Sequence, residues 1–268
     1  MQKPLINFVH ANGFPSGSYK TFFEYFSDDF NIVAHSKYGH DKAFPVDNNW
    51  QNMVDELIQY IEQQLIKHQQ TKLIGIGHSF GGVITFMAAC QRPELFSQLI
   101  MLDPPVFVGS KALGISLIKN TKYIDKFSPA GKAQSRRRTW PIGTNMEALF
   151  ARKALFRNFD KRCLHDYVES GIKEENNQLE LVFKADVEAD IFRKMVTNLS
   201  RYKNKLQVPA TLLHATKTDL GPIELFEKFT KLNKKIKLES FEGGHMFPLE
   251  KPQETALKLK SIIKLAGV

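Results

Sequence analysis

The sequence predicts a buried strand, a glycine-rich turn and an apolar helix in direct succession in Leu73-Ile74-Gly75-Ile76-Gly77-His78-Ser79-Phe80-Gly81-Gly82-Val83-Ile84. A serine on such a turn must adopt a strained backbone conformation. Its neighbours two positions before and after must be small, or they collide with the adjoining strand and helix. Gly77 and Gly81 meet that requirement. The turn exposes a hydroxyl above the sheet, so Ser79 is the candidate nucleophile.

A serine hydroxyl is a poor nucleophile at neutral pH and needs a general base within hydrogen-bond reach. His245 follows the last predicted strand, and Gly243 and Gly244 before it allow its loop to approach the serine. An acid that orients the imidazole is expected between nucleophile and base in chain order. Asp219, directly after the fifth predicted strand, is the preferred candidate. Asp103, at the end of the fourth, is the alternative.

Short apolar runs alternate with amphipathic segments in both halves of the chain, which predicts a parallel sheet with helices on both faces. Strands are expected at residues 5–9, 30–34, 72–76, 99–102, 210–214 and 236–241. Residues 106–205 interrupt this alternation with polar, mostly helix-like sequence. We therefore expect an α/β core domain of residues 1–105 and 206–268. Residues 106–205 would be a mainly helical lid domain inserted over the C-terminal ends of the strands.

Four motifs contain the candidate residues: His10-Ala11-Asn12-Gly13-Phe14-Pro15, Gly77-His78-Ser79-Phe80-Gly81-Gly82, Thr218-Asp219-Leu220 and Gly243-Gly244-His245-Met246-Phe247-Pro248. Together they resemble the motifs of the α/β-hydrolase family, over nearly the whole chain. The resemblance implies an oxyanion hole, in which backbone amides stabilise a developing negative charge. One donor would be the amide of Phe80. The other would be that of Asn12, or of Phe14 under another alignment.

Two departures from the family pattern refine this expectation. The strand before the first motif begins at Leu5, so the two strands that open the full fold are absent. We therefore expect a six-stranded, all-parallel sheet flanked by helices. The nucleophile is a serine, whereas family members that open epoxides or displace halide use aspartate at that position. The resemblance therefore disfavours those two activities.

The net charge of +9 lies entirely in the proposed insertion. Residues 106–205 hold 20 Lys and Arg against 11 Asp and Glu, whereas the rest of the chain is balanced. Charge runs on lid helices are usually a solvated face, so nucleic-acid binding is not expected, and attraction of anionic substrates or a membrane surface is the alternative. No stretch reaches the ~20 apolar residues of a membrane helix, and no signal-peptide core is present. A cytoplasmic protein without stable membrane insertion is expected.

The family resemblance implies hydrolysis of a small-molecule carboxylic ester through an acyl-enzyme intermediate. It implies no metal and no organic cofactor, and the sequence assigns no oligomeric state. Residues 106–205 would cap an apolar acyl or aryl pocket. Phe14 and Phe247 flank catalytic loops and are the expected substrate contacts. The alternatives are carbon–carbon bond hydrolysis, cofactor-free perhydrolysis, long-chain lipid hydrolysis, and a small-molecule receptor with weak or no turnover.

Overall fold

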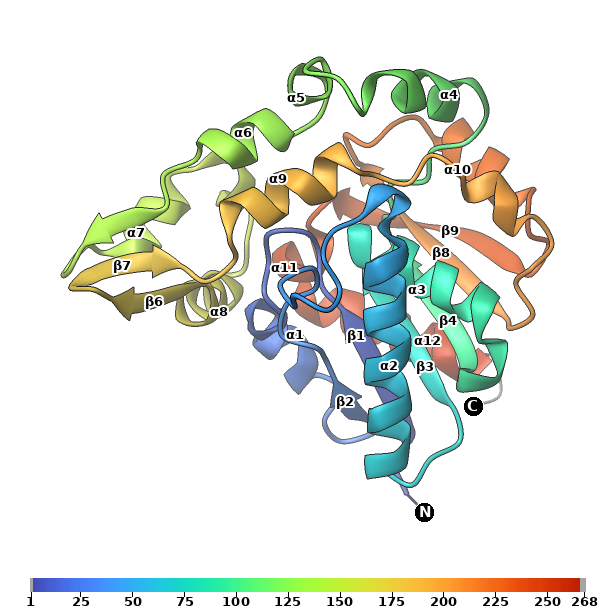
Figure 1. Cartoon of the computed structure of the whole chain (residues 1–268). Helices are drawn as coiled ribbons and strands as arrows, with labels where there is room; N and C mark the ends of the chain where they lie inside the picture. The colour runs from blue at the N-terminus through green and yellow to red at the C-terminus, as the bar shows by residue number, and fades with distance from the viewer. Residues whose placement is uncertain (1, 266–268) are drawn as a thin grey trace.

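The computed structural model describes residues 2–265 and is built around a six-stranded sheet, shown in Figure 1. Every neighbouring pair of its strands is parallel. In spatial order the strands are β2 (Asn31–Val33), β1 (Leu5–Val9), β3 (Leu73–His78), β4 (Phe96–Leu102), β8 (Ala210–Lys217) and β9 (Ile236–Gly244). The predicted six-stranded, all-parallel sheet is therefore confirmed.

Alternating side chains along the strands build a hydrophobic core on each face of the sheet. In β1, Leu5 and Val9 belong to one core cluster, while Ile6 and Phe8 belong to the other. The first face is covered by α2 (Gln51–Lys67), α3 (Phe80–Gln91) and α10 (Ile223–Thr230). The second is covered by α1 (Lys20–Glu24), α11 (Phe247–Glu250) and α12 (Pro252–Leu265). Because both faces are buried, the central strands are nearly continuous apolar runs.

The segment between β4 and β8, called the insertion below, lies beyond the C-terminal ends of the strands (Figure 1). Its helices are α4 (Gly109–Ile118), α5 (Ile124–Phe127), α6 (Ala130–Ser135), α7 (Met146–Ala151), α8 (Lys161–Gly171) and α9 (Ala185–Arg193). Its short 3-10 helices are η4 (Ala154–Phe156) and η5 (Leu199–Tyr202). Three others lie outside the insertion, η1 (Ser16–Tyr19), η2 (Asn48–Trp50) and η3 (Pro93–Leu95). The insertion is mainly helical, as predicted.

The insertion also contains a small antiparallel sheet that was not predicted from the sequence. Its strands are β5 (Thr139–Pro141), β7 (Gln178–Leu181) and β6 (Ile172–Glu175), in that spatial order. Asn176 and Asn177 join β6 to β7 with φ values of 51° and 57°. Two successive left-handed residues form the tight turn that suits a two-residue hairpin, and asparagine tolerates it. These strands are largely polar, so the asparagine pair was the available signal.

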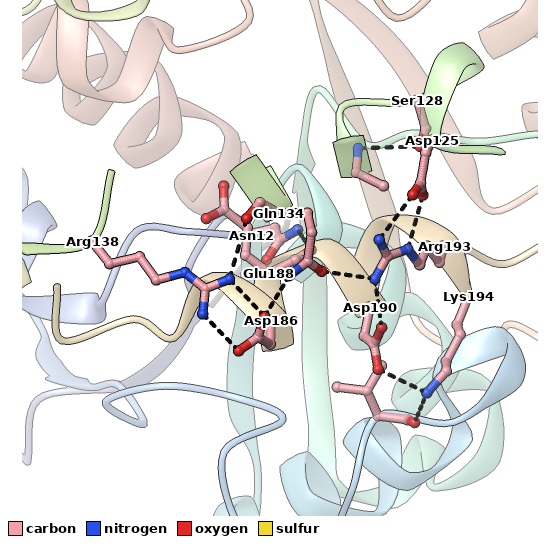
Figure 2. A network of polar contacts seen from close by, with 12 residues as sticks. Asn12, Asp125, Ser128, Gln134, Arg138, Asp186, Glu188, Asp190, Arg193 and Lys194 are labelled. Carbon is pink, nitrogen blue, oxygen red and sulfur yellow. Dashed lines mark hydrogen bonds and ion pairs between the residues drawn. The ribbon is translucent and has the colours of Figure 1, made fainter. Parts of the chain in front are cut away.

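Ion pairs join α9 to the α5–α6 region across the insertion (Figure 2). Arg193 makes two parallel contacts to Asp125, from Nε to Oδ1 at 2.8 Å and from Nη2 to Oδ2 at 2.9 Å. Arg138 makes a second bidentate pair with Asp186, at 2.9 and 2.8 Å. Such fork-like pairs fix orientation as well as distance. They hold α9 in a defined position relative to the rest of the insertion.

Candidate active site

Ser79 lies in a strained turn between β3 and α3. Its φ of 55° and ψ of −123° are rare for a residue other than glycine. A Cβ atom added to Gly77 would lie 2.3 Å from the carbonyl oxygen of Gly81. One added to Gly81 would lie 2.3 Å from the carbonyl oxygen of Val9. Glycine at both positions therefore permits the close approach of strand, turn and helix that exposes the Ser79 hydroxyl.

Hydrogen bonds join Ser79, His245 and Asp103 in a row. The Ser79 hydroxyl lies 3.0 Å from Nε2 of His245, and Nδ1 of the same ring lies 2.7 Å from Oδ2 of Asp103. Because a carboxylate only accepts, Nδ1–H donates to Asp103, and Nε2 is left to accept the serine proton. The structure thus brings the predicted nucleophile and base together, with a carboxylate on the far side of the imidazole.

The carboxylate in this row is Asp103, and the expectation that Asp219 would occupy the position is corrected. Asp103 is fully buried. Its Oδ1 accepts the Ala215 amide at 3.0 Å, and its Oδ2 accepts the Thr218 hydroxyl at 2.6 Å. Asp219 is instead exposed, with its side chain on the wall of the cavity. The loop after β8 therefore supports the acid without supplying it.

The order of the strands in the sheet is consistent with Asp103, and not Asp219, contacting His245. β4 lies between β3 and β8, so Asp103, directly after β4, lies between the Ser79 turn and the loop after β8. The amide of Asp103 donates to Leu213 at 2.8 Å, and Leu102 accepts the amide of Ser79 at 2.8 Å. Chain order alone permits either carboxylate, because both lie between Ser79 and His245 in the sequence. Asp103 was the alternative that the sequence left open.

The loop after β1 lies against the Ser79 turn and contains the expected oxyanion donors. The amide of Phe14 donates to the carbonyl of Ala11 at 3.1 Å, so it is already engaged. The Asn12 side chain donates to the carbonyl of Glu188 in α9 at 3.0 Å (Figure 2). That bond fixes the residue and leaves its backbone amide available. This arrangement favours Asn12 over Phe14 as the partner of the Phe80 amide.

A buried hydrogen-bond network connects the three loops of the site through His78. Its Nε2 lies 2.9 Å from the carbonyl of His245, and its Nδ1 lies 2.7 Å from the hydroxyl of Tyr19. The Tyr19 oxygen also accepts the amide of Ala11 at 3.2 Å. Burial lowers the pKa of His78 to about 3, so the ring is neutral and Nε2–H donates to the carbonyl. Tyr19 was not among the predicted site residues.

The Ser79 hydroxyl and the His245 ring open into a cavity of about 550 Å³ between the sheet and the insertion. Phe14 lines the cavity, as expected. Phe247 does not, and the expectation that it contacts substrate is corrected. Its ring is fully buried and stacks on Phe241 at 4.5 Å between centroids. Phe247 begins α11 and faces the core.

Fold and site geometry together define an α/β hydrolase. A sequence model described as "Alpha/beta hydrolase family" matches residues 8–258, so the chain belongs to that family. Within residues 2–265, no helix has the length and apolar character needed to cross a bilayer.

Proteins with related sequences include some whose names describe enzymes that act on acyl groups. The chain is 32% identical over 120 residues to a type I acyl-CoA thioesterase of Penicillium brevicompactum, a match that covers 44% of this chain and 25% of that protein. The chain thus spans about a quarter of the length of that relative. It is 22% identical over 275 residues to a monoglyceride lipase homolog of Monkeypox virus, covering 98% of this chain and 87% of that protein.

Solved structures share the fold at low sequence identity. A peroxisomal alpha-beta-hydrolase of Saccharomyces cerevisiae superimposes with a TM-score of 0.81 at 13% identity, covering 98% of this chain and 78% of that one. An E-2-(acetamidomethylene)succinate hydrolase superimposes with a TM-score of 0.78 at 18% identity, covering 98% and 92%. These likenesses show a shared fold and no more.

Proposed function

We propose that the protein is a serine hydrolase that cleaves carboxylic esters of small to medium acyl or aryl substrates through an acyl-enzyme intermediate. One observation carries the proposal. A buried carboxylate, an imidazole and a hydroxyl on the wall of a cavity form a row with contacts of 2.7 and 3.0 Å. Such a row lets the imidazole accept a proton from the hydroxyl while the carboxylate stabilises the resulting positive charge.

In the acylation step, the Ser79 oxygen forms a bond to the ester carbonyl carbon while its proton moves to Nε2 of His245. The carbonyl π electrons move onto the oxygen, where the amides of Asn12 and Phe80 stabilise them. One such donor contributes about 3 kcal/mol to transition-state stabilisation. The tetrahedral intermediate then reforms the carbonyl and breaks the bond to the alcohol oxygen, which takes the proton from His245.

In the deacylation step, water replaces the alcohol. Nε2 of His245 takes a proton from the water while the water oxygen attacks the acyl carbon. His245 then returns that proton to the Ser79 oxygen as the acid leaves. Asp103 keeps Nδ1 protonated throughout, so Nε2 is free to accept in both half-reactions. The net reaction consumes one ester and one water and releases an acid and an alcohol.

Residues 106–205 act in this proposal as a cap domain on the core of residues 1–105 and 206–268. The cavity lies where the two meet, with Ser79 and Phe80 on one side and Phe156 and Ile191 of the insertion on the other. A thioesterase and a lipase homolog among the relatives support an acyl substrate. The core would then supply the chemistry, and the cap would select the substrate.

Labelling and turnover together test the proposal. A fluorophosphonate probe should modify Ser79 alone, as shown by peptide mapping, and Ser79→Ala should remain unlabelled. A series of p-nitrophenyl esters of increasing acyl length should then be hydrolysed with repeated turnover. Labelling without turnover would point to a small-molecule receptor, and labelling at another serine would contradict the assignment of the nucleophile.

A further inference from the structure

The cationic excess of the insertion reaches into the cavity that contains Ser79. Lys132, Arg136 and Lys153 all line it, and all three come from the insertion. The carboxylates on the same wall are those of Glu188 and Asp219. The rest of the lining is mostly aromatic and aliphatic. An apolar cavity with a cationic wall is suited to a ligand with an apolar body and an anionic group.

Arg136 is already paired, and its pairing fixes the wall. Its Nη2 lies 2.6 Å from Oε2 of Glu188, and only 23% and 13% of the two side chains are exposed. The same guanidinium donates to the carbonyl of Phe183 at 3.2 Å. The backbone carbonyl of Glu188 also accepts a hydrogen bond from the Asn12 side chain (Figure 2). The ion pair therefore lies beside the oxyanion loop, with its charges mutually compensated.

The two lysines are not compensated in this way. Neither Lys132 nor Lys153 forms an ion pair with a carboxylate in the described part of the chain. The ammonium of Lys153 lies 4.3 Å from the centroid of the Phe150 ring, another residue of the cavity wall. Burial and the charge of Arg136 both lower the pKa of Lys153. Both effects disfavour the charged form of Lys153, and an anion bound beside its ammonium would favour that form.

We propose that the cavity takes an acyl substrate that carries an anionic group, with Lys132 and Lys153 binding that group while the apolar part lies against Phe14 and Phe156. The proposal rests on the proposed function and names the substrate class for it. A carboxylate on the acyl chain and a phosphate on the leaving group share the chemistry that the lysines recognise. Matched substrate pairs distinguish these two sources.

The first pair is mono-p-nitrophenyl adipate and p-nitrophenyl hexanoate, which differ in a terminal carboxylate on the acyl chain. The second is S-hexanoyl-4′-phosphopantetheine and S-hexanoylpantetheine, which differ only in the phosphate of the leaving group. We expect kcat/KM for the anionic member of one pair to exceed that of its neutral partner by about tenfold, the effect of one charge-assisted contact. Sodium chloride at about 0.5 M should lower this ratio.

Variants locate the effect on the protein. Lys153→Gln and Lys132→Gln should each lower the ratio of anionic to neutral kcat/KM several-fold while the neutral substrate is still hydrolysed. Arg152→Gln is the matched control, because Arg152 is adjacent to Lys153 in sequence, is exposed and lies outside the cavity lining. It removes the same charge and should keep the ratio. Circular dichroism and thermal unfolding establish that each variant is folded.

The outcomes separate the inference from the proposed function. Ratios at or below one for both pairs, or a preference that both lysine variants retain, would overturn the anionic substrate class while ester hydrolysis stands. If Ser79 is neither labelled nor active, the proposed function fails. If Ser79 is labelled but no substrate turns over, an anionic ligand should protect it from the probe better than its neutral partner does, in the pair adipamate and hexanamide or in the pair 4′-phosphopantetheine and pantetheine. Equal protection within both pairs would also overturn the inference.

Discussion

The edge of the sheet that carries Ser79, Asp103 and His245, called the catalytic edge after its proposed role, meets the insertion at one cavity, but each is held in place in a different way. At the edge, Asp103 is fully buried, and both its carboxylate oxygens accept protein hydrogen bonds. In the insertion, the ion pairs of Arg193 with Asp125 and of Arg138 with Asp186 attach α9 through side chains that are 26% to 64% exposed, and the pair of Arg136 with Glu188 is more buried. Buried, fully bonded groups tolerate little displacement, whereas partly exposed charges are screened by water and salt. The edge is therefore suited to fixed chemistry, and the insertion to variation.

The largest expected effect separates the two carboxylates that the sequence left open. Asp103→Asn should lower kcat/KM for a p-nitrophenyl ester by about 10³–10⁴-fold, because an amide no longer holds the imidazole tautomer that accepts the serine proton. Asp219→Asn makes the same chemical change at an exposed position and should alter kcat/KM by less than about threefold. Equal losses in the two variants would show that the observed row is not the catalytic one.

Acid should weaken the catalytic edge through its buried histidines. Burial lowers the pKa of both His10 and His78 to about 3, against about 6.5 in an unfolded chain. Between these values the unfolded chain binds more protons, so stability falls as pH falls from about 6.5. We expect each histidine to remove about 2 kcal/mol from the free energy of unfolding between pH 7 and pH 5, measured in urea.

A variant tests whether this pH dependence comes from the edge. His78→Asn should remove between a third and a half of the loss between pH 7 and pH 5, whatever its effect at neutral pH, because partial burial also lowers the pKa of His40 to about 4. His165→Gln is the control, because His165 is an exposed residue of the insertion paired with Glu147, which raises its pKa. That variant should not flatten the profile. A wild-type free energy of unfolding that is constant from pH 7 to pH 5 would contradict the expectation.

Tyr19→Phe examines the network that connects the loops of the edge. The change removes the hydroxyl that bonds the Ala11 amide and the His78 ring, and both of these groups are buried. It should lower the free energy of unfolding by about 1–3 kcal/mol. We also expect kcat to fall about tenfold with little change in KM, because His245 loses positioning and the cavity is intact. Tyr25→Phe is the control, since its hydroxyl meets Arg162 at the surface. A Tyr19→Phe enzyme with unchanged kcat would limit the network to stability.

The sequence predicted the edge better than the insertion, for physical reasons. Fully buried strands must be apolar, and the glycines beside Ser79 are required by backbone contacts, so both features are visible in one chain. The acid was misassigned because Asp103 and Asp219 both lie between Ser79 and His245 in the chain, so chain order does not separate them. Phe247 was misassigned because a residue next to a catalytic loop can face either the cavity or the core. The β6–β7 hairpin is polar, so only Asn176 and Asn177 marked it.

The smallest expected effect concerns the ion pairs of the insertion. The pair of Arg193 with Asp125 is less exposed than that of Arg138 with Asp186. Arg193→Gln should therefore lower the free energy of unfolding by about 0.5–1 kcal/mol, and Arg138→Gln by less than about 0.5 kcal/mol. About 1 M sodium chloride should shrink both differences, because it screens exposed charges, but should leave the loss in Tyr19→Phe largely unchanged, since that network is buried and lacks formal charges. If salt reduced the Tyr19→Phe loss equally, the contrast between the edge and the insertion would not hold.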